Sequence, residues 1–148
     1  MKRVNSGARE ANNVYPDLLY GEGRSEEMLE FYKKALGAEV KMLMRFKDAP
    51  DHSNMAPGSG DKVMHAVFAI GDTDVMISDG MNKGTPKFDG FALTVQAKDG
   101  AEAEKYFSAL VAGGEVTMPL TETFFAKSFG MLKDKFGVHW MVIAAKPM

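Results

Sequence analysis

Residues 31–42 read FYKKALGAEVKM, and residues 106–118 repeat this pattern as YFSALVAGGEVTM. The offset is 75 residues between Phe31 and Tyr106 and 76 residues between Glu39 and Glu115, so the second copy holds one additional residue. In both copies a helical pattern ends at glycine and runs into a short strand pattern. The repeat predicts two similar structural units within a chain of 148 residues.

The same order of predicted elements surrounds each copy, namely a strand, a helix and three further strands. Ser25 is the expected N-cap of the first helix, and Asp99, with Glu102 three residues later, caps the second. Pro119 is expected to stop a short strand, after which an aromatic loop at 121–127 replaces a regular strand. The predicted strands are 14–20, 40–46, 63–70, 74–78, 91–97, 115–118, 128–133 and 138–144.

This order is typical of the α+β class. We expect two tandem βαβββ units that form a curved mixed sheet, with helices on its outer face and a concave cleft on the other face. Residues 1–13 lack periodicity and are expected to form a flexible N-terminal tail. Residues 14–148 then form a single domain, with units at about 14–80 and 88–145 and a linker at 81–87.

The composition excludes several classes of protein. Eighteen basic and 20 acidic residues give a net charge of −2, and no basic stripe is interleaved with aromatic residues, so nucleic acid is not an expected partner. No cysteine is present, which excludes disulfides and thiolate chemistry. No apolar run reaches the ~18 residues that a membrane span needs. We therefore expect a cytoplasmic protein without membrane contact.

Twelve methionines are a high count for a chain of this length. Methionine is unbranched and polarisable, so it fills irregular gaps in a core. It also makes an adaptable lining for an apolar pocket. Both interpretations stay open from the sequence.

Several stretches together resemble the vicinal oxygen chelate superfamily, which includes glyoxalase I, extradiol dioxygenases, fosfomycin-resistance transferases and bleomycin-binding proteins. The chain is most similar to the PhnB-like branch, often labelled demethylubiquinone methyltransferase-like, over about residues 14–145. The matching stretches are EFYKKALGAE at 30–39, MHA at 64–66, VMISD at 75–79, TETFFA at 121–126 and DKFGVHWM at 134–141. The methyltransferase label lacks support, because no Gly-rich strand-to-helix turn followed by an acidic residue is present to hold S-adenosylmethionine.

Metal-dependent members of this superfamily hold one divalent ion with ligands on the first and last strands of each unit. Matching the strands places these positions at Gly90 and Met141 in the second unit, and at Tyr15 and the Asp74 to Val75 region in the first. Glycine has no side-chain donor, and methionine is a poor ligand for hard cations. We therefore predict no metal ion at the superfamily's usual position and no cofactor.

The three histidines leave a second metal arrangement open. His52 lies in a long polar loop, where solvation is expected, whereas His65 and His139 lie on predicted strands. If both faced the cleft, Asp79 or Glu122 would complete a set of two histidines and one carboxylate. The alternative is that each histidine is hydrogen-bonded or partly exposed and binds nothing.

Alternation along the last predicted strand separates Trp140 from His139 and Met141. The resemblance places Met141 toward the cleft, so His139 is expected there as well, and Trp140 packs beneath the helices. The same rule applied to the strand at 91–97 sends Thr94 to the cleft. It sends the other alternate set to the core, namely Phe91, Leu93 and Val95.

The segment at 121–127 carries two adjacent aromatics, of which at least one is expected in the core while the other covers the cleft. These are Phe124 and Phe125. Glu122 is a candidate general base if it is buried, and the alternative is a solvated or ion-paired carboxylate. Asp79 is a polar candidate for ligand binding or a simple turn residue.

Three functions remain open from the sequence. The first is a small-molecule-binding protein without the usual metal site and with its reaction unassigned. The second is a metal-dependent lyase, isomerase or dioxygenase acting on vicinal oxygens, and the third is sequestration of an aromatic or antibiotic-like compound without chemistry. The resemblance also implies a homodimer. The expected ligand-binding residues are His65, Met76, Asp79, Thr94, Phe124, Phe125, His139 and Met141.

Overall fold

The computed structural model describes residues 18–50, 60–80 and 87–147. The chain divides between Pro86 and Lys87 into two compact units. Some of the predictions fall outside the described residues: the N-terminal tail, Tyr15, His52 and residues 81–86 of the linker.

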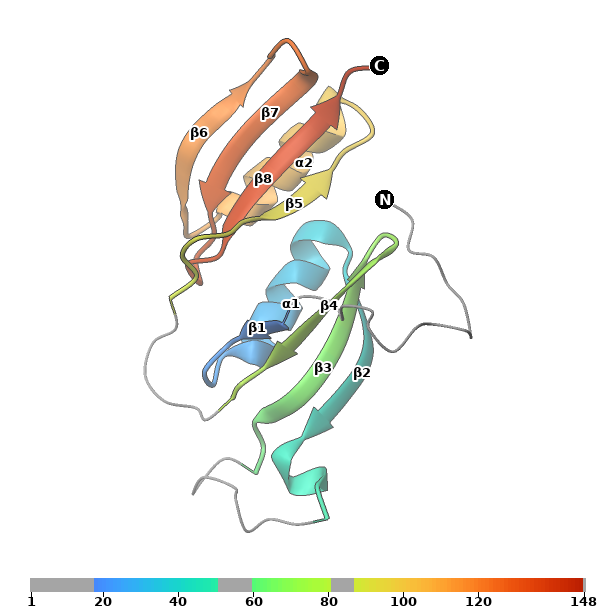
Figure 1. The fold of residues 1–148 in the computed structure, drawn as a ribbon, viewed down its shortest axis with the longest axis vertical. Coiled ribbons are helices and arrows are strands. Elements are labelled where there is room, and N and C mark those ends of the chain that lie inside the picture. The colour runs from blue at the N-terminus through green and yellow to red at the C-terminus, as the bar shows by residue number, and fades with distance from the viewer. Residues whose placement is uncertain (1–17, 51–59, 81–86, 148) are drawn as a thin grey trace. The chain divides into compact units, whose positions relative to one another are not determined.

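Unit 1 is a four-stranded mixed sheet covered on one face by a helix (Figure 1). The strand order is β1-β4-β3-β2, in which β1 pairs with β4 in parallel and the other pairs are antiparallel. A short 3₁₀ turn at Phe46–Asp48 follows β2. The elements are β1 Leu18–Tyr20, α1 Ser25–Leu36, β2 Glu39–Arg45, β3 Val63–Ile70 and β4 Thr73–Ser78.

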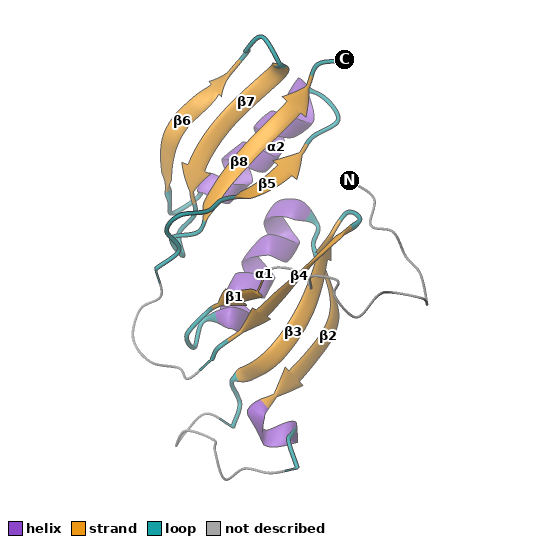
Figure 2. Ribbon diagram, in the orientation of Figure 1, coloured by secondary structure: helices purple, strands orange, loops and turns teal. Residues whose placement is uncertain are grey.

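Unit 2 repeats this plan with the strand order β5-β8-β7-β6 (Figure 2). Here β5 pairs with β8 in parallel, and the other pairs are antiparallel. The predicted α+β class with tandem βαβββ units is confirmed, and each unit builds a sheet of its own. The elements are β5 Leu93–Gln96, α2 Gly100–Val111, β6 Glu115–Thr121, β7 Ala126–Lys133 and β8 His139–Ala145.

The duplication extends to an irregularity in the sheets. In β2 the pairing register with β3 shifts between Val40 and Met42, which leaves Lys41 as an additional residue. In β6 the register with β7 shifts between Val116 and Met118, which leaves Thr117 as the corresponding residue. Such a β-bulge bends and twists an edge strand. The two units therefore share their local strand geometry as well as their topology.

Helix α1 buries the face that its spacing predicts, including Met28, Leu29 and Tyr32. Tyr32 stacks on Phe68 of β3, with ring centroids 5.8 Å apart. Gly37 ends the helix in the left-handed conformation with φ 68°. Because α1 covers one side of its sheet, the opposite side, which we call the open face, is left to carry other side chains.

The N-cap prediction for α1 is wrong. Ser25 is the first helical residue, and the N-cap is Arg24, whose side chain makes no capping bond. The backbone N–H of Ser25 instead donates to the carboxylate of Asp79, 54 residues away in sequence. A cap that comes from another element leaves no local sequence signal, and this explains the error.

Helix α2 is capped as predicted. The Asp99 side chain accepts from the backbone N–H of Glu102 at 2.8 Å, and the Glu102 carboxylate accepts from the N–H of Lys98 at 3.0 Å. The helix packs on β7 and β8 of its own sheet. Its buried residues, Ala103, Phe107 and Leu110, cover Trp140, which is 1% exposed.

Two sequence predictions for unit 2 need correction. Pro119 does not stop β6, which continues to Thr121, because β6 is an edge strand where one missing N–H costs no ladder bond. Phe91 is 44% exposed and outside the core, because β5 begins only at Leu93. Neither described helix, each of 12 residues, is long and apolar enough to cross a membrane.

Candidate functional site

A transverse row of side chains crosses the open face of each sheet. In unit 1, Met76 of β4 lies between Leu18 on one side and Val67 on the other, and Met42 of β2 completes the row. Directly paired residues on neighbouring strands place their side chains on the same face. Leu18 and Met42 are 37% and 36% exposed, so the row is accessible within its unit.

The row in unit 2 has the same construction. Met141 of β8 lies between Thr94 of β5 and Met131 of β7, and Met118 of β6 completes it. The Thr94 hydroxyl lies 3.9 Å from the Met141 sulfur. The strand neighbours of Met141, Trp140 and Val142, are buried, as alternation requires.

These two rows, which we call the methionine rows, correspond through the repeat. Leu18 and Thr94 are 76 residues apart, as are Met42 and Met118. Five of the twelve methionines lie in the rows. Unbranched thioether side chains adapt their shape to different apolar partners, so such rows suit variable apolar contacts.

The predicted histidines lie beside the rows. His65 of β3 pairs with Met44 of β2, one step along from the Met42–Val67 pair. His139 of β8 pairs with Lys133, and its Nε2 lies 3.8 Å from a carboxylate oxygen of Asp89. Both histidines are partly exposed in their units, so each is accessible to a polar group of a ligand.

A cavity of about 510 Å³ opens in unit 1 near the ends of β1 and β4. Tyr20 and Ser78, which are paired across these strands, form one wall. Met64 reaches the cavity because the register of β2 against β3 shifts there, with Met44 opposite His65 and Arg45 opposite Val63. The remaining lining residues are Glu22, Phe46 and Gly80.

Gly80 allows the cavity wall to close tightly. Its φ is +57°, and a Cβ atom placed there would lie 3.0 Å from Cδ1 of Tyr20 and 3.3 Å from Oε1 of Glu22. The aromatic ring and the carboxylate therefore both lie over the same glycine. Glu22 itself has φ +48°, a left-handed conformation that costs a non-glycine residue about 1 kcal/mol.

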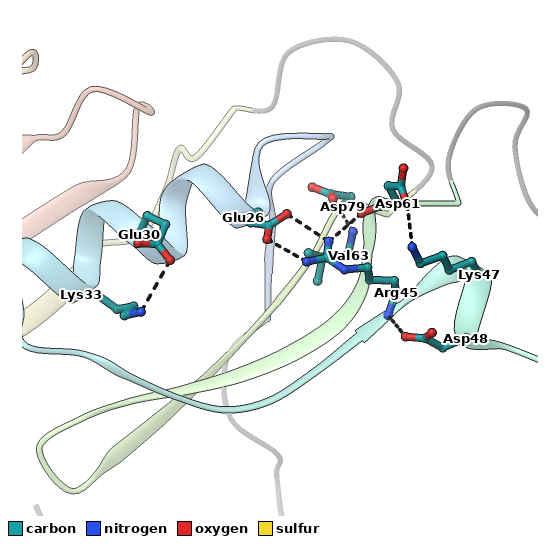
Figure 3. A network of polar contacts seen from close by, with 9 residues as sticks. All are labelled: Glu26, Glu30, Lys33, Arg45, Lys47, Asp48, Asp61, Val63 and Asp79. Carbon is teal, nitrogen blue, oxygen red and sulfur yellow. Dashed lines mark hydrogen bonds and ion pairs between the residues drawn. The ribbon is translucent and has the colours of Figure 1, made fainter.

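Asp79, a predicted ligand-binding residue, holds the chain segments around this cavity (Figure 3). One carboxylate oxygen accepts from the N–H groups of Gly23 at 2.8 Å and Ser25 at 2.9 Å, and the other accepts from Val63 at 2.7 Å. The residue is 1% exposed. Its carboxylate therefore ties the start of α1 and the start of β3 to the end of β4.

A second polar contact fastens β2 to α1 (Figure 3). The Arg45 guanidinium forms a bidentate pair with Glu26, at 3.0 and 2.7 Å. The hydrogen bond from Arg45 holds the pKa of the Glu26 carboxyl below its usual range. Arg45 also donates to the carbonyl of Asp61 at 2.7 Å, so it fixes the residue that leads into β3.

The aromatic segment of unit 2 is a tight turn between β6 and β7. The N–H of Thr123 donates to the carbonyl of Ala126, and the Thr123 hydroxyl accepts from the N–H of Ala126. Phe124 is 92% exposed and Phe125 is 41% exposed, so the prediction that one of them is core is wrong. The turn places Phe124 at its tip, while Phe125 contacts Phe129 edge to face at 5.2 Å.

Glu122 lies beside this turn and forms an ion pair with Lys146 at 3.0 Å. Its side chain is 71% exposed. The burial that general base catalysis was expected to require is absent at this position, and the alternative interpretation, an ion-paired surface carboxylate, matches the structure.

Among the described residues, no group of three or more His, Asp or Glu side chains could hold a metal ion. Asp74, the carboxylate at one carried-over metal position, binds the ammonium of Lys41 at 3.1 Å. Gly90 has φ +83° and supplies no side chain.

Sequence reasoning missed four residues of the cavity. Phe46 belongs to a short 3₁₀ turn that was expected to be strand, and Met64 depends on the bulge in the pairing of β2 and β3. Ser78 and Glu22 lay within segments that were read as a strand end and a turn. The Gly-Glu-Gly sequence at 21–23 was a local signal, because glycines around a carboxylate indicate an unusual backbone.

Comparison with known proteins gives a consistent family match. A family model described as 3-demethylubiquinone-9 3-methyltransferase matches residues 12–143. Protein YjdN of Escherichia coli (strain K12) is 33% identical over 132 residues, which cover 84% of this chain and 90% of YjdN.

Solved structures agree with the sequence match. Protein PA1353 from Pseudomonas aeruginosa superposes with a TM-score of 0.77 at 34% identity, covering 90% of this chain and 98% of its own. A putative 3-demethylubiquinone-9 3-methyltransferase, PhnB protein, from Bacillus cereus has a TM-score of 0.74 at 28% identity, with 90% and 100% covered. A glyoxalase-related enzyme from Fulvimarina pelagi, at 16% identity and a TM-score of 0.61, with 90% and 88% covered, shares the fold alone.

Proposed function

The chain belongs to the 3-demethylubiquinone-9 3-methyltransferase family, in the PhnB-like branch of the vicinal oxygen chelate superfamily, and from this premise we propose that it binds a small molecule on the open faces of its sheets. The reaction, if any, is unassigned. Methyl transfer is not part of the proposal, because the sequence lacks a Gly-rich strand-to-helix turn for S-adenosylmethionine.

The observation that carries this proposal is the pair of methionine rows. A sheet face that stays in water is usually polar, whereas here both open faces carry apolar rows at equivalent positions. Apolar surface arranged this way gains free energy when a ligand covers it, at about 25 cal/mol per Å². Methionine lets one face accept more than one ligand shape.

Polar groups at the edges of the rows supply orientation in this proposal. His65, Thr94 and His139 offer hydrogen-bonding atoms next to Met76 and Met141. A few polar groups around an apolar surface are typical of small-molecule sites. Asp79 supports the site through its three backbone bonds.

Phe124 and Phe125 complete the proposed ligand-binding set as an aromatic cover for the bound molecule. Their exposure leaves both rings available for such a contact. Glu122 receives no catalytic role, because its carboxylate is exposed and paired with Lys146. We further propose, from the family, that the protein is a cytoplasmic homodimer.

A thermal-shift screen with flat apolar compounds tests the proposed function. We expect compounds that raise the Tm of the wild-type protein in a concentration-dependent manner, since a ligand that binds only the folded state stabilises it. The M76K and M141K variants place a charge within a row and should lose at least half of that Tm rise.

The matched control is T73K, which introduces the same side chain at the exposed start of β4, outside the row. This variant should keep the full ligand-induced Tm rise. A screen without any stabilising compound would count against small-molecule binding, and equal losses in T73K and M76K would count against the rows as the site.

A further inference from the structure

We propose that the cavity of unit 1 accepts an organic ammonium group, a protonated amine or quaternary ammonium attached to an apolar body. This inference rests on the proposed function and narrows it to one ligand class. It concerns the lining residues Tyr20, Glu22, Phe46, Met64, Ser78 and Gly80, all within one unit.

The chemistry of the lining favours a cation with apolar surroundings. Tyr20 and Phe46 contribute aromatic rings, whose faces attract ammonium groups, and Met64 contributes a polarisable thioether. Glu22 is the one lining residue that carries a charge, and that charge is negative. An anion would meet both the carboxylate and the negative faces of the rings, so the lining discriminates by sign.

The carboxylate and an aromatic ring stand next to each other at the bottom of this arrangement. Both Tyr20 and Glu22 lie within 3.3 Å of the position that a Gly80 side chain would occupy. An ammonium group placed at this wall would therefore contact a carboxylate and an aromatic ring at once. This combination is typical of sites that recognise substituted ammonium ions.

The backbone at Glu22 gives a second, independent reason. Its φ of +48° is unfavourable for a residue with a side chain, and glycines on both sides would each adopt it without strain. Strained conformations persist where the surrounding structure holds them, and they cluster at ligand-binding positions. Here the bonds of Asp79 to Gly23 and Ser25 hold the turn that presents the carboxylate.

The neighbouring charges are arranged around this turn without neutralising the proposed contact. The Lys62 ammonium donates to the carbonyl of Gly23 at 3.1 Å. The Arg45 guanidinium is paired with Glu26, and Asp79 is buried among backbone N–H groups. The two cations and the two further carboxylates balance one another, which leaves Glu22 to set the sign of the cavity.

The test is an ¹⁵N NMR titration of the full chain with three benzyl compounds of different charge: benzyltrimethylammonium, benzyl alcohol and phenylacetate. We expect the cation to shift the amide signals of Glu22, Gly23 and Gly80 and to bind at least about fivefold more tightly than the other two. The E22Q variant should lose at least about fivefold in affinity for the cation. The E30Q variant, which removes an exposed carboxylate of α1, should bind as the wild-type protein does.

The E22G variant guards against a folding artefact, because glycine suits the left-handed backbone and removes the carboxylate. It should keep or raise the Tm while losing affinity for the cation. Equal binding of the three compounds, or full affinity in E22Q and E22G, would overturn the ligand class and leave small-molecule binding intact. Absence of binding by all three compounds, in a protein that does bind compounds of the apolar screen, would also overturn the ligand class.

Discussion

The D79A variant is expected to lose about 3 kcal/mol or more of the free energy of unfolding. Asp79 is 1% exposed, and its carboxylate accepts from three backbone N–H groups, those of Gly23, Ser25 and Val63. Alanine would leave these donors without their acceptor. A buried donor that loses its partner costs about 1–3 kcal/mol, and bonds to a charged acceptor lie at the upper end.

Urea denaturation followed by far-UV circular dichroism measures this loss. The D79N variant keeps one acceptor oxygen and should lie between the wild-type protein and D79A. Asp72 is the matched control, because it is an exposed aspartate in the turn between β3 and β4, and D72A should change stability by less than about 0.5 kcal/mol. If D79A and D72A behaved alike, Asp79 would not be the link between the first helix and the strands.

The W140A variant is expected to cost about 4 kcal/mol. Trp140 is 1% exposed on the helix-facing side of β8, so its removal leaves a large cavity beneath α2. Its indole N–H also donates to the buried carboxylate of Asp134 at 2.9 Å. That oxygen would lose its side-chain donor, while the other oxygen keeps the N–H groups of Phe136 and Val138.

The two contributions at Trp140 can be separated with W140F, which keeps much of the apolar volume and removes the N–H. We expect a loss of about 2 kcal/mol for W140F, between the wild-type protein and W140A. Far-UV circular dichroism is again the readout, since the variants lack the single tryptophan. The control is F91A, an exposed aromatic of the same unit, which should cost less than about 1 kcal/mol. A W140A protein as stable as F91A would contradict the assignment of Trp140 to the core.

Much of the fold was predictable because the decisive signals are local and occur twice. The helical spacing from Met28 to Leu36 identified the buried face of α1, and Gly37 marked its end. The strand at Val63–Ile70 agrees with its prediction at both ends. Pro119 misled the prediction because its effect depends on whether a strand lies at the edge of a sheet, and one sequence does not reveal that.

The candidate site divides in the same way. Strand alternation placed Thr94 and Met141 on one face correctly, because the period of two needs no tertiary information. The methionine rows needed the pairing registers, and the unit 1 cavity needed the register shift at Met64. Asp79 read as a turn or ligand residue, since its three partners lie between 16 and 56 positions away in sequence.

The measurement that tests the central claim most directly is an NMR titration of protein labelled with ¹³C at the methionine methyl groups, using the compound with the largest effect in the thermal-shift screen. The account predicts that the methyl signals of a methionine row shift, while the signal of Met28, buried beneath α1, does not. The row signals are those of Met42, Met76, Met118, Met131 and Met141. Binding that leaves all five row methyl signals unchanged would contradict the claim that the open faces form the binding site.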